Sequence, residues 1–230
     1  MSDVRIVPLT GIPEVRPGDA LRALLGDAVE RAGGLEEGDV VVVAQKAVSK
    51  AEGRVEQADD YLAVVRREAR AVRRERDDLI IAETEHGFVC ASAGVDRSNA
   101  PEKGWVVLLP RDPDASAAGI RAALGERFGL SPAVIVSDSF GRAWRQGTTD
   151  VAIGVAGLRP LLDLRGTRDA RGYTLGSTVI AVADELAGAA ELVMGKARGV
   201  PAVLIRGYRA TEGEGSAREL VMPPERDLFP

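Results

Sequence analysis

The segment Ser137–Gly147 (SDSFGRAWRQG) gathers hydroxyl, carboxylate and guanidinium groups in one short stretch. Its hydroxyls and the carboxylate of Asp138 suit a hard cation such as Mg²⁺ or Mn²⁺, which takes oxygen ligands. Arg142 and Arg145 suit phosphate or carboxylate groups, because a guanidinium binds them through two parallel hydrogen bonds. Asp138, Arg142 and Arg145 are therefore candidate catalytic residues for metal-assisted chemistry on a phosphorylated substrate. A glycine-containing loop with a solvated aspartate accounts for the segment alone about equally well.

A second candidate is the stretch Gln45–Lys50, which directly follows the apolar run Val40–Ala44. Two lysines and a hydroxyl at the end of a strand can bind phosphates through charge and hydrogen bonds. Neither of the two common phosphate-binding loops, Gly-x-x-x-x-Gly-Lys-Ser/Thr and Gly-x-Gly-x-x-Gly after a strand, occurs in the sequence. A nucleotide would therefore need a different kind of site, although a lysine pair after a strand is also common on protein surfaces.

Further oxygen donors are spread through the second half of the chain. They are Asp169 between two glycine-marked turns, Thr178, the pair Asp184–Glu185, and Glu214 in an acidic, glycine-containing loop. That loop could close over a metal-bound phosphate or simply face solvent. His86 is the only histidine of the chain, and a single histidine is more often a structural residue than a catalyst.

Composition narrows the class of protein. The chain has 230 residues, of which 45% are hydrophobic and 28% charged, as is ordinary for a globular protein with a sizeable core. The formal net charge of −5 argues against nucleic-acid binding, because a binding domain usually carries a basic excess. One cysteine and one histidine leave no disulfide framework and no histidine-rich metal site. No signal peptide or membrane-spanning stretch is visible, so a cytoplasmic enzyme is expected.

Strands and helices must position these residues. The apolar runs Val40–Ala44 and Ala133–Val136 are predicted to be buried strands, and candidate site residues follow each of them. Amphipathic spacing predicts four helices. The first begins after a cap at Asp19, the second extends over Tyr61–Arg76, the third runs from a cap at Asp114 to Phe128, and the fourth extends over about 178–196. Other strands are predicted over residues 4–9, 79–82, 88–91, 105–109, 151–155 and 200–205. Because strands and helices do not alternate strictly, the predicted fold class is α+β.

Four stretches together resemble the coenzyme F420-0:L-glutamate ligases, which attach glutamate to a deazaflavin cofactor precursor with GTP. The stretches are Val41–Arg54 (VVVAQKAVSKAEGR), His86–Asn99 (HGFVCASAGVDRSN), Ser137–Gly154 (SDSFGRAWRQGTTDVAIG) and Ala181–Lys196 (AVADELAGAAELVMGK). They fall in the order of the family, and the resemblance covers essentially the whole chain. Each stretch alone is a weak signal, but their combination is highly specific.

The resemblance implies a single α+β ligase domain over residues 1–230, with two subdomains in a fold peculiar to the family and an intertwined homodimer. It also implies a GTP site that avoids the common phosphate-binding loop. The nucleotide contacts of the family correspond to Ile12, Pro13, Glu14, Val15, Gln45, Lys50 and Gly141. The implied partners are GTP, L-glutamate and F420-0, with no nucleic acid and no membrane.

The resemblance further implies divalent metal ions, Mg²⁺ or Mn²⁺ and two in number, with K⁺ as a further activator. Asp138 corresponds to a metal-binding aspartate. A second metal contact in relatives falls at Val179, whose side chain offers no oxygen ligand. Thr178, Asp169 and Glu214 are the candidate replacements. The glycines beside Glu214 favour that residue, because a flexible loop can move towards arriving phosphates.

An amide ligase suits these residues chemically. A carboxylate condenses with an amine only after one of its oxygens becomes a good leaving group, and transfer of the GTP γ-phosphate to form an acyl phosphate would achieve this. Metal ions and cationic side chains stabilise the charge of such a transfer, and no protein nucleophile is needed. Two alternatives remain. One is a GTP-dependent ligase of the same fold that acts on another carboxylate, and the other is a non-catalytic nucleotide- or deazaflavin-binding module.

Overall fold

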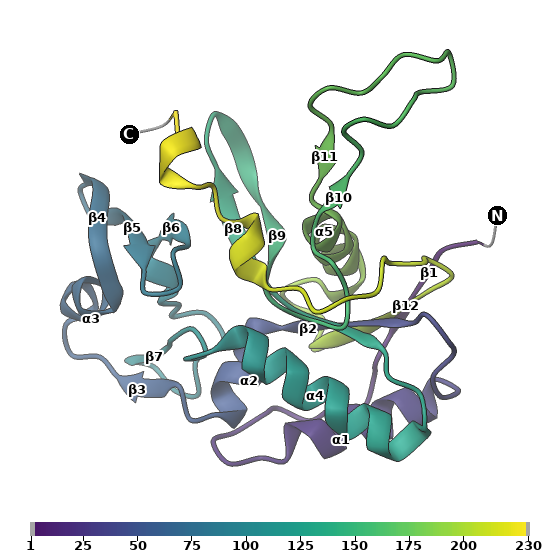
Figure 1. Cartoon of the computed structure of the whole chain (residues 1–230). Helices are drawn as coiled ribbons and strands as arrows, with labels where there is room; N and C mark the ends of the chain where they lie inside the picture. Colours follow the sequence, from purple (N-terminus) through teal and green to yellow (C-terminus); the bar gives the residue numbers. More distant parts are fainter. Residues whose placement is uncertain (1–2, 229–230) are drawn as a thin grey trace.

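The computed structural model describes residues 3–228 and is built around one five-stranded sheet (Figure 1). The strands lie in the order β1 (Arg5–Pro8), β12 (Ala202–Arg206), β2 (Val40–Ala44), β8 (Ala133–Arg142) and β9 (Arg145–Ala156). The central neighbours β2 and β8 are parallel, and the other neighbouring pairs of this sheet are antiparallel. The mixed pairing agrees with the predicted α+β class.

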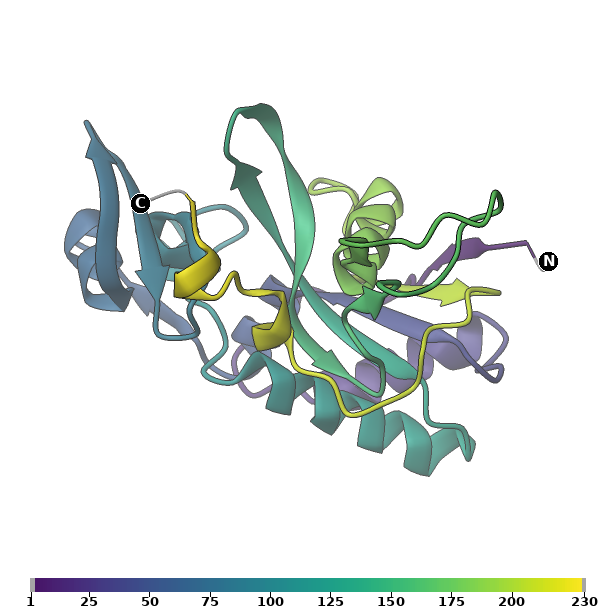
Figure 2. The ribbon, with the colours of Figure 1, turned by 45° about the horizontal axis from the view of Figure 1, so that its top comes forward.

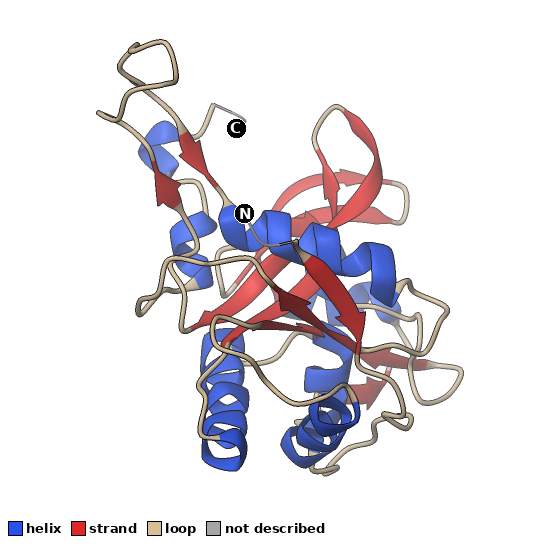
Figure 3. Cartoon of the chain, turned by 90° about the vertical axis from the view of Figure 1, so that its right-hand side faces the viewer, coloured by secondary structure: helices blue, strands red, loops and turns tan. Residues whose placement is uncertain are grey.

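Helices cover both faces of this sheet (Figures 1 and 3). On one face α4 (Pro113–Phe128) packs against β8 and β9, with α1 (Leu21–Arg31) beside it, while α5 (Val182–Met194) packs on the other face. The valines Val40–Val43 of β2 are completely buried between these layers. A uniformly apolar strand is stable where both of its faces are covered, so β2 forms the middle of the core. No helix within residues 3–228 is long and apolar enough to cross a membrane.

A second, smaller hydrophobic cluster is formed by the chain between β2 and β8, and Figure 1 shows it to one side of the main sheet. Its elements are α3 (Tyr61–Glu68), the sheet of β4 (Ala69–Arg76), β5 (Leu79–Thr84) and β6 (Val89–Ala91), and the pair β3 (Val55–Gln57) and β7 (Trp105–Val107). Its buried residues are Val64, Val65, Ile80, Ala82, Ala93, Val95, Val106 and Leu108. The predicted two-subdomain division and the predicted homodimer stay predictions.

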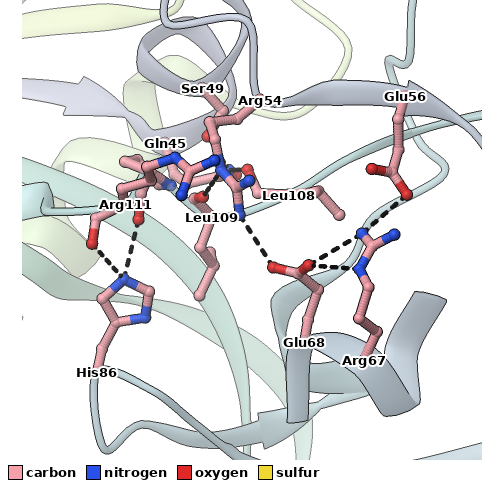
Figure 4. Close-up of polar contacts among 11 residues, drawn as sticks. Gln45, Ser49, Arg54, Glu56, Arg67, Glu68, His86, Leu108, Leu109 and Arg111 are labelled. Carbon is pink, nitrogen blue, oxygen red and sulfur yellow. Dashed lines mark hydrogen bonds and ion pairs between the residues drawn. The ribbon is translucent and has the colours of Figure 1, made fainter.

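Arg54 joins this smaller cluster to the segment that leads back to the main sheet (Figure 4). Its Nε donates to the backbone oxygen of Leu109 at 2.9 Å, and its guanidinium pairs with Glu68 of α3 at 2.9 Å. Glu68 also pairs with Arg67, which reaches Glu56 of β3 at 2.8 Å. The two clusters are therefore connected by charged as well as apolar contacts.

The helix predicted over Tyr61–Arg76 is wrong in its second half. Residues 69–76 form strand β4, which pairs antiparallel with β5. The helical spacing of apolar residues continues to Val72, but this side chain is 45% exposed. Its neighbour Arg73 forms an ion pair with Glu83 on the adjacent strand β5. Hydrogen bonding and side-chain pairing across the sheet therefore outweigh the helical periodicity.

Two predicted helix caps are also wrong. The carboxylate of Asp19 accepts from the backbone nitrogen of Arg16 at 2.8 Å, and the cap position of α1 is Ala20, which makes no side-chain capping bond. The N-cap of α4 is Asp112, which accepts from a backbone N–H of the first turn at 2.9 Å. The observed N-caps are therefore one residue after the predicted Asp19 and two residues before the predicted Asp114. Both predicted carboxylates accept hydrogen bonds from other backbone N–H groups instead.

Asp114, predicted to cap α4, lies in its first turn and has a different function. Its carboxylate accepts from the backbone nitrogens of Val155 at 2.7 Å and Ala217 at 3.0 Å. The hydroxyl of Ser216 donates to it at 2.6 Å. One side chain thereby joins α4, β9 and the C-terminal segment.

Several other boundaries differ from the prediction. The helix predicted over about 178–196 begins at Val182, because β11 (Val179–Ile180) pairs with β10 (Leu162–Asp163) ahead of it. The predicted phosphate-binding stretch Gln45–Lys50 forms a short helix, α2 (Gln45–Ala51). Its first turn directly follows β2, so the end of the strand and the start of the helix form one corner.

The segment Ser137–Gly147 is a hairpin arm rather than a loop. β8 and β9 continue beyond the sheet, with Gly141 opposite Thr148 and Arg142 opposite Arg145. Figure 2 shows this two-stranded arm rising out of the sheet. The outer part of the arm, residues 141–148, is fully exposed and carries no alternating apolar pattern, and for this reason its strands cannot be predicted from sequence.

Candidate functional site

A cavity of about 410 Å³ opens at the carboxyl ends of the parallel strands β2 and β8. Its wall consists of the turn Ile12–Val15, the start of α2, residues Ser137–Ser139 of β8, Asp150 of β9, and the end of α5 with the loop that follows. Ligands commonly bind beyond the carboxyl ends of parallel strands, where successive connections diverge. This cavity is the candidate active site.

Asp138 is the acidic centre of the cavity. Although part of its surface is open to the cavity, the surrounding protein keeps its carboxyl away from bulk water. Burial raises the pKa of this carboxyl to about 7; the Ser139 backbone N–H and the charge of Lys46 oppose that rise, and the charges of Asp150 and Asp96 add to it. A positive charge bound beside Asp138 would favour its ionised form.

Asp150 faces the cavity from β9, directly opposite Ser139. It is 4% exposed, and its two carboxylate oxygens accept from the hydroxyls of Ser137 at 2.9 Å and Ser139 at 2.5 Å. Both serine hydroxyls are thereby fixed, and each keeps its own oxygen available as an acceptor or ligand. Sequence reasoning alone assigns no role to Asp150; recognition of the hairpin register would have placed it opposite Ser139.

Lys46, in the first turn of α2, lines the cavity and pairs with a third aspartate, Asp96, which lies outside the cavity lining. Its Nζ lies 2.6 Å from Asp96 Oδ2 and donates to Ser98 Oγ at 2.7 Å. Burial alone would raise the pKa of Asp96, but the hydrogen bond and charge of Lys46, with further bonds from Ser98, lower it below its ordinary value. Asn99 of the same loop also lines the cavity. Sequence reasoning gave Asp96 no specific role and missed Asn99, although both lie at the polar end of the stretch His86–Asn99.

The predicted nucleotide contacts near the N-terminus all reach this cavity. Ile12, Pro13, Glu14 and Val15 line it, and so does Lys50 of α2. Lys50 is 4% exposed, and its ammonium pairs with Glu14, whose side chain is largely exposed. A buried ammonium with a solvent-facing partner is arranged so that a phosphate oxygen can take the place of the carboxylate.

Gln45 lines the cavity as well, but its amide is used inside the protein. Its Nε2 donates to Ser49 Oγ at 2.6 Å and to the backbone oxygen of Leu108 at 3.0 Å (Figure 4). These bonds hold the start of α2 against the smaller cluster. The structure therefore gives Gln45 a positioning role, and its predicted contact with GTP stays a prediction.

Three predicted residues of the hairpin arm, all beyond Asp138, do not reach the cavity. Gly141, Arg142 and Arg145 lie near the exposed tip of the arm, and none of them lines the cavity. Arg142 donates within the arm, to the backbone oxygen of Gln146 at 3.4 Å. A strand advances by about 3.3 Å per residue, so extension of β8 carries both arginines away from Asp138. Their predicted catalytic role and the predicted GTP contact of Gly141 stay predictions.

The three candidates for a second metal ligand lie apart from the cavity. Asp169 lies in the loop between β10 and β11, where its Oδ1 accepts from the backbone nitrogens of Arg171 and Tyr173. Thr178 lies at the base of that loop, and its backbone oxygen accepts from Leu164. Glu214 lines a different cavity. The structure brings none of them to Asp138.

The oxygen donors of the cavity suit one hard cation. Asp138, Asp150 and Ser139 all line it, the Ser139 hydroxyl is bonded to Asp150, and Asp138 and Asp150 repel each other electrostatically. Within residues 3–228 no group of three or more His, Cys, Asp or Glu side chains forms a ready-made metal cage. Mg²⁺ commonly binds through one or two carboxylates, with water and substrate phosphates completing its shell, so these residues fit such an ion.

Two further candidate groups are structural. His86 Nε2 lies 2.9 Å from the backbone oxygen of Pro110 and 3.1 Å from that of Arg111 (Figure 4), and its ring stacks on Phe88. Burial, followed by the charge of Asp138, raises the pKa of Cys90 to about 12, so this thiol stays protonated. Neither side chain is arranged as a nucleophile.

Comparison with known proteins gives a consistent set of relatives. A family model described as F420-0:Gamma-glutamyl ligase matches residues 11–207. The chain is 42% identical to the Coenzyme F420:L-glutamate ligase of Methanopyrus kandleri, over 98% of this chain and 97% of the relative. It is 42% identical to that of Methanothermobacter thermautotrophicus, over 98% of each chain. For the enzyme of Archaeoglobus fulgidus the identity is 36%, over 98% of this chain and 96% of the relative.

Proposed function

The chain belongs to the F420-0:gamma-glutamyl ligase family, and on that premise we propose that it is a GTP-dependent ligase that joins L-glutamate to coenzyme F420-0. One observation supports the nucleotide part of this proposal. The residues that correspond to nucleotide contacts, Ile12–Val15 and Lys50, line the same cavity as Asp138 although they lie far apart in the sequence. The volume of about 410 Å³ is within the range of small-molecule sites.

The proposed reaction has two steps. In the first, a carboxylate oxygen of the precursor attacks the γ-phosphorus of GTP, the bond to the β-phosphate oxygen breaks, and GDP leaves with the electron pair. In the second, the amine of L-glutamate attacks the acyl phosphate carbonyl, the new amide forms, phosphate is expelled and the amine loses a proton. Lys46 and Lys50, two of the three lysines that line the cavity, are suited to bind the phosphates of the nucleotide.

Asp138, Asp150 and Ser139 would hold a divalent cation, Mg²⁺ or Mn²⁺, which when bound supplies charge neutralisation for phosphoryl transfer. The proposal also includes a second divalent ion and K⁺, to which no ligands are assigned. The protein itself supplies no covalent intermediate in this scheme. Cys90, with its pKa raised to about 12, remains a thiol that stays out of the reaction.

The direct test combines purified protein, GTP, Mn²⁺, L-glutamate and F420-0. The expected product is heavier than F420-0 by one glutamyl unit in mass spectrometry, with GDP and phosphate released in equal amounts. Reactions without glutamate, with ATP in place of GTP, and with Asp138→Asn are the controls. GDP release with another carboxylate acceptor but not with F420-0 would favour the alternative of a GTP-dependent ligase that acts on a different carboxylate. Nucleotide binding with no product from any acceptor would favour the non-catalytic module.

A further inference from the structure

Two side chains of opposite charge lie on the wall of the cavity that α5 provides. Glu191 belongs to the last turn of α5 and is half-buried, and Lys196 follows in the exposed loop that returns to β12. Both line the cavity that contains Asp138. The charge of Lys196 acts on the carboxyl of Glu191, so the two groups are near each other.

Neither of these side chains has a partner within the protein. Among residues 3–228, Glu191 and Lys196 make no hydrogen bond and no ion pair through their side chains. Lys46 and Lys50, the other lysines of the cavity, both pair with carboxylates. One carboxylate and one ammonium of the cavity are therefore available to a ligand that carries both charges.

Small residues line the cavity beside this pair. Gly195, Ala197 and Gly199 belong to the same wall, and Gly195 and Gly199 have φ angles of +52° and +66°. Glycine adopts this left-handed backbone without strain, which allows the loop to turn back within a few residues. Met194, 2% exposed, also lines the wall. Side chains of one methyl group or none leave room for the carbon skeleton of a small ligand.

Glu191 also lies on the side of the cavity where phosphoryl transfer is proposed. Burial raises the pKa of Glu191, and the charge of Asp150 adds to the rise, while Lys196 and two other basic side chains oppose it. The charge of Asp150 acts at Glu191 because the two carboxylates face the same cavity. A ligand bound to Glu191 is therefore close to the residues proposed for the metal.

We propose that Glu191 and Lys196 form the binding site for the amino-acid substrate, in which Glu191 binds its ammonium and Lys196 binds its α-carboxylate. The inference rests on the proposed function, in which L-glutamate supplies the amine. The ammonium and the α-carboxylate of an amino acid are attached to one carbon atom, so two neighbouring side chains of opposite charge match them. The site places the amine on the side of the cavity where the acyl phosphate is proposed to form.

The experiment uses two analogues of L-glutamate that each lack one charged group. Glutarate lacks the ammonium, and 4-aminobutyrate lacks the α-carboxylate. Initial rates of glutamylation by the full chain, at saturating GTP, Mn²⁺ and F420-0, give the KM for L-glutamate. The two analogues are added as competitors, and their inhibition constants are measured in the parent and in each variant.

Each variant is expected to lose affinity only for ligands that carry the group it binds. Glu191→Gln should raise the KM for L-glutamate about tenfold, since a charge-assisted hydrogen bond is lost, and should weaken 4-aminobutyrate but not glutarate. Lys196→Met should raise this KM about fivefold, a smaller factor because water screens an exposed ammonium. It should weaken glutarate but not 4-aminobutyrate. The KM for GTP should stay unchanged in both variants.

Matched controls separate this result from a general effect of charge or folding. Glu185→Gln changes an exposed glutamate of the same helix outside the cavity, and Lys103→Met changes an exposed lysine outside it. Both are expected to behave like the parent. Lys196→Arg keeps the positive charge and should retain a KM for L-glutamate close to that of the parent.

Three results would overturn the binding site and leave the proposed ligase intact. The first is an unchanged KM for L-glutamate in Glu191→Gln and Lys196→Met with an active parent. The second is an equal loss of both analogues in both variants, as a structural defect would cause. The third is a raised KM for GTP in Lys196→Met without a change for L-glutamate, which would assign Lys196 to the nucleotide. A parent that forms no glutamylated product overturns the proposed function, and this inference with it.

Discussion

Ser139 and Asp150 face each other across the β8–β9 pair, and the serine hydroxyl donates to the aspartate at 2.5 Å. The other oxygen of Asp150 accepts from Ser137 at 2.9 Å. This one carboxylate therefore orients both hydroxyls of the strand that carries Asp138. The cavity depends on the register of the hairpin for its chemistry as well as for its shape.

Asp150→Asn is expected to lower turnover about tenfold and to raise the Mn²⁺ concentration needed for activity. An amide has a single acceptor oxygen, so one of the two serine hydroxyls loses its partner. Initial rates measured over a range of Mn²⁺ concentrations will show this. Asp163→Asn is a suitable control, because Asp163 is exposed, pairs with Arg165 and lies outside the cavity. An unchanged Mn²⁺ dependence in Asp150→Asn would remove Asp150 from the site.

Asp138→Asn is expected to abolish glutamylation and to make the protein more stable at alkaline pH. Burial raises the pKa of Asp138 to about 7, above the value of about 3.9 in an unfolded chain. Between these values the folded protein binds more protons than the unfolded one, so stability falls as pH rises from about 4 to about 7. The amide lacks this loss, and the free energy of unfolding of the variant should exceed that of the parent by roughly 4 kcal/mol at pH 8.

Urea unfolding of parent and Asp138→Asn at pH 5 and pH 8, both with a metal chelator, measures this difference. The gain of the variant should be smaller at pH 5, where the aspartate of the folded parent is largely protonated. A gain that is the same at both pH values would show that the carboxyl of Asp138 titrates normally.

Lys50→Ala is expected to weaken GTP binding by about ten- to a hundredfold. A charge-assisted hydrogen bond contributes about 1.5–3 kcal/mol, and about 1.4 kcal/mol corresponds to a factor of ten. Its present partner, Glu14, is largely exposed and can be solvated when the lysine is removed, so the fold should persist. Calorimetric titration with GTP gives the affinity, with Lys103→Ala, a change at an exposed lysine outside the cavity, as control. Equal affinities in parent and Lys50→Ala would exclude Lys50 from the nucleotide site.

Glu214→Gln is expected to leave the Mn²⁺ dependence of activity unchanged, contrary to the expectation from sequence. Glu214 lines a cavity with Glu36, Glu37 and Arg121, separate from the one that contains Asp138. A metal titration at saturating GTP tests this. A higher Mn²⁺ requirement in the variant would mean that the loop around Glu214 reaches a metal in the working enzyme.

Asp114→Ala is expected to destabilise the protein by roughly 3 kcal/mol, because Val155, Ser216 and Ala217 lose a shared charged acceptor. Asp112→Ala, which removes only the N-cap of α4, should cost about 1 kcal/mol. Urea unfolding of the two variants compares neighbouring aspartates on the same helix. Equal losses would show that Asp114 contributes no more than a helix cap.

The apolar elements were the part of the fold that could be predicted from sequence. The valines of β2 and the run Val134–Val136 are buried on both faces, and burial leaves a continuous hydrophobic signal. The exposed elements were not predictable in this way. The residues of β4 have a helical spacing of apolar side chains although they form a strand. The outer part of the hairpin arm is exposed on both faces, so its strands show no alternation of apolar and polar residues.

The candidate site was predictable where chemistry follows a buried strand, as at Asp138 and Lys50. Asp96 and Asp150 could not be assigned, because their places depend on tertiary pairing. Asp96 pairs with the cavity residue Lys46, and Asp150 lies in the cavity opposite Ser139. Residues of the expected types at Asp169, Thr178 and Glu214 lie elsewhere for the same reason. Residue type alone cannot tell which of several acidic loops meets a given strand end.

The parallel pairing of β2 with β8 has a consequence for how the protein folds. The two strands are neighbours in the sheet, yet the whole smaller cluster lies between Ala44 and Ala133 in the chain. Pairing across such a separation has a large loop-closure entropy and is expected to be slow. The binding cavity forms at the ends of these two strands, so it exists only after that late step. A nucleotide that binds there selects the completed fold, and saturating GTP should slow proteolysis of the whole chain by mass action.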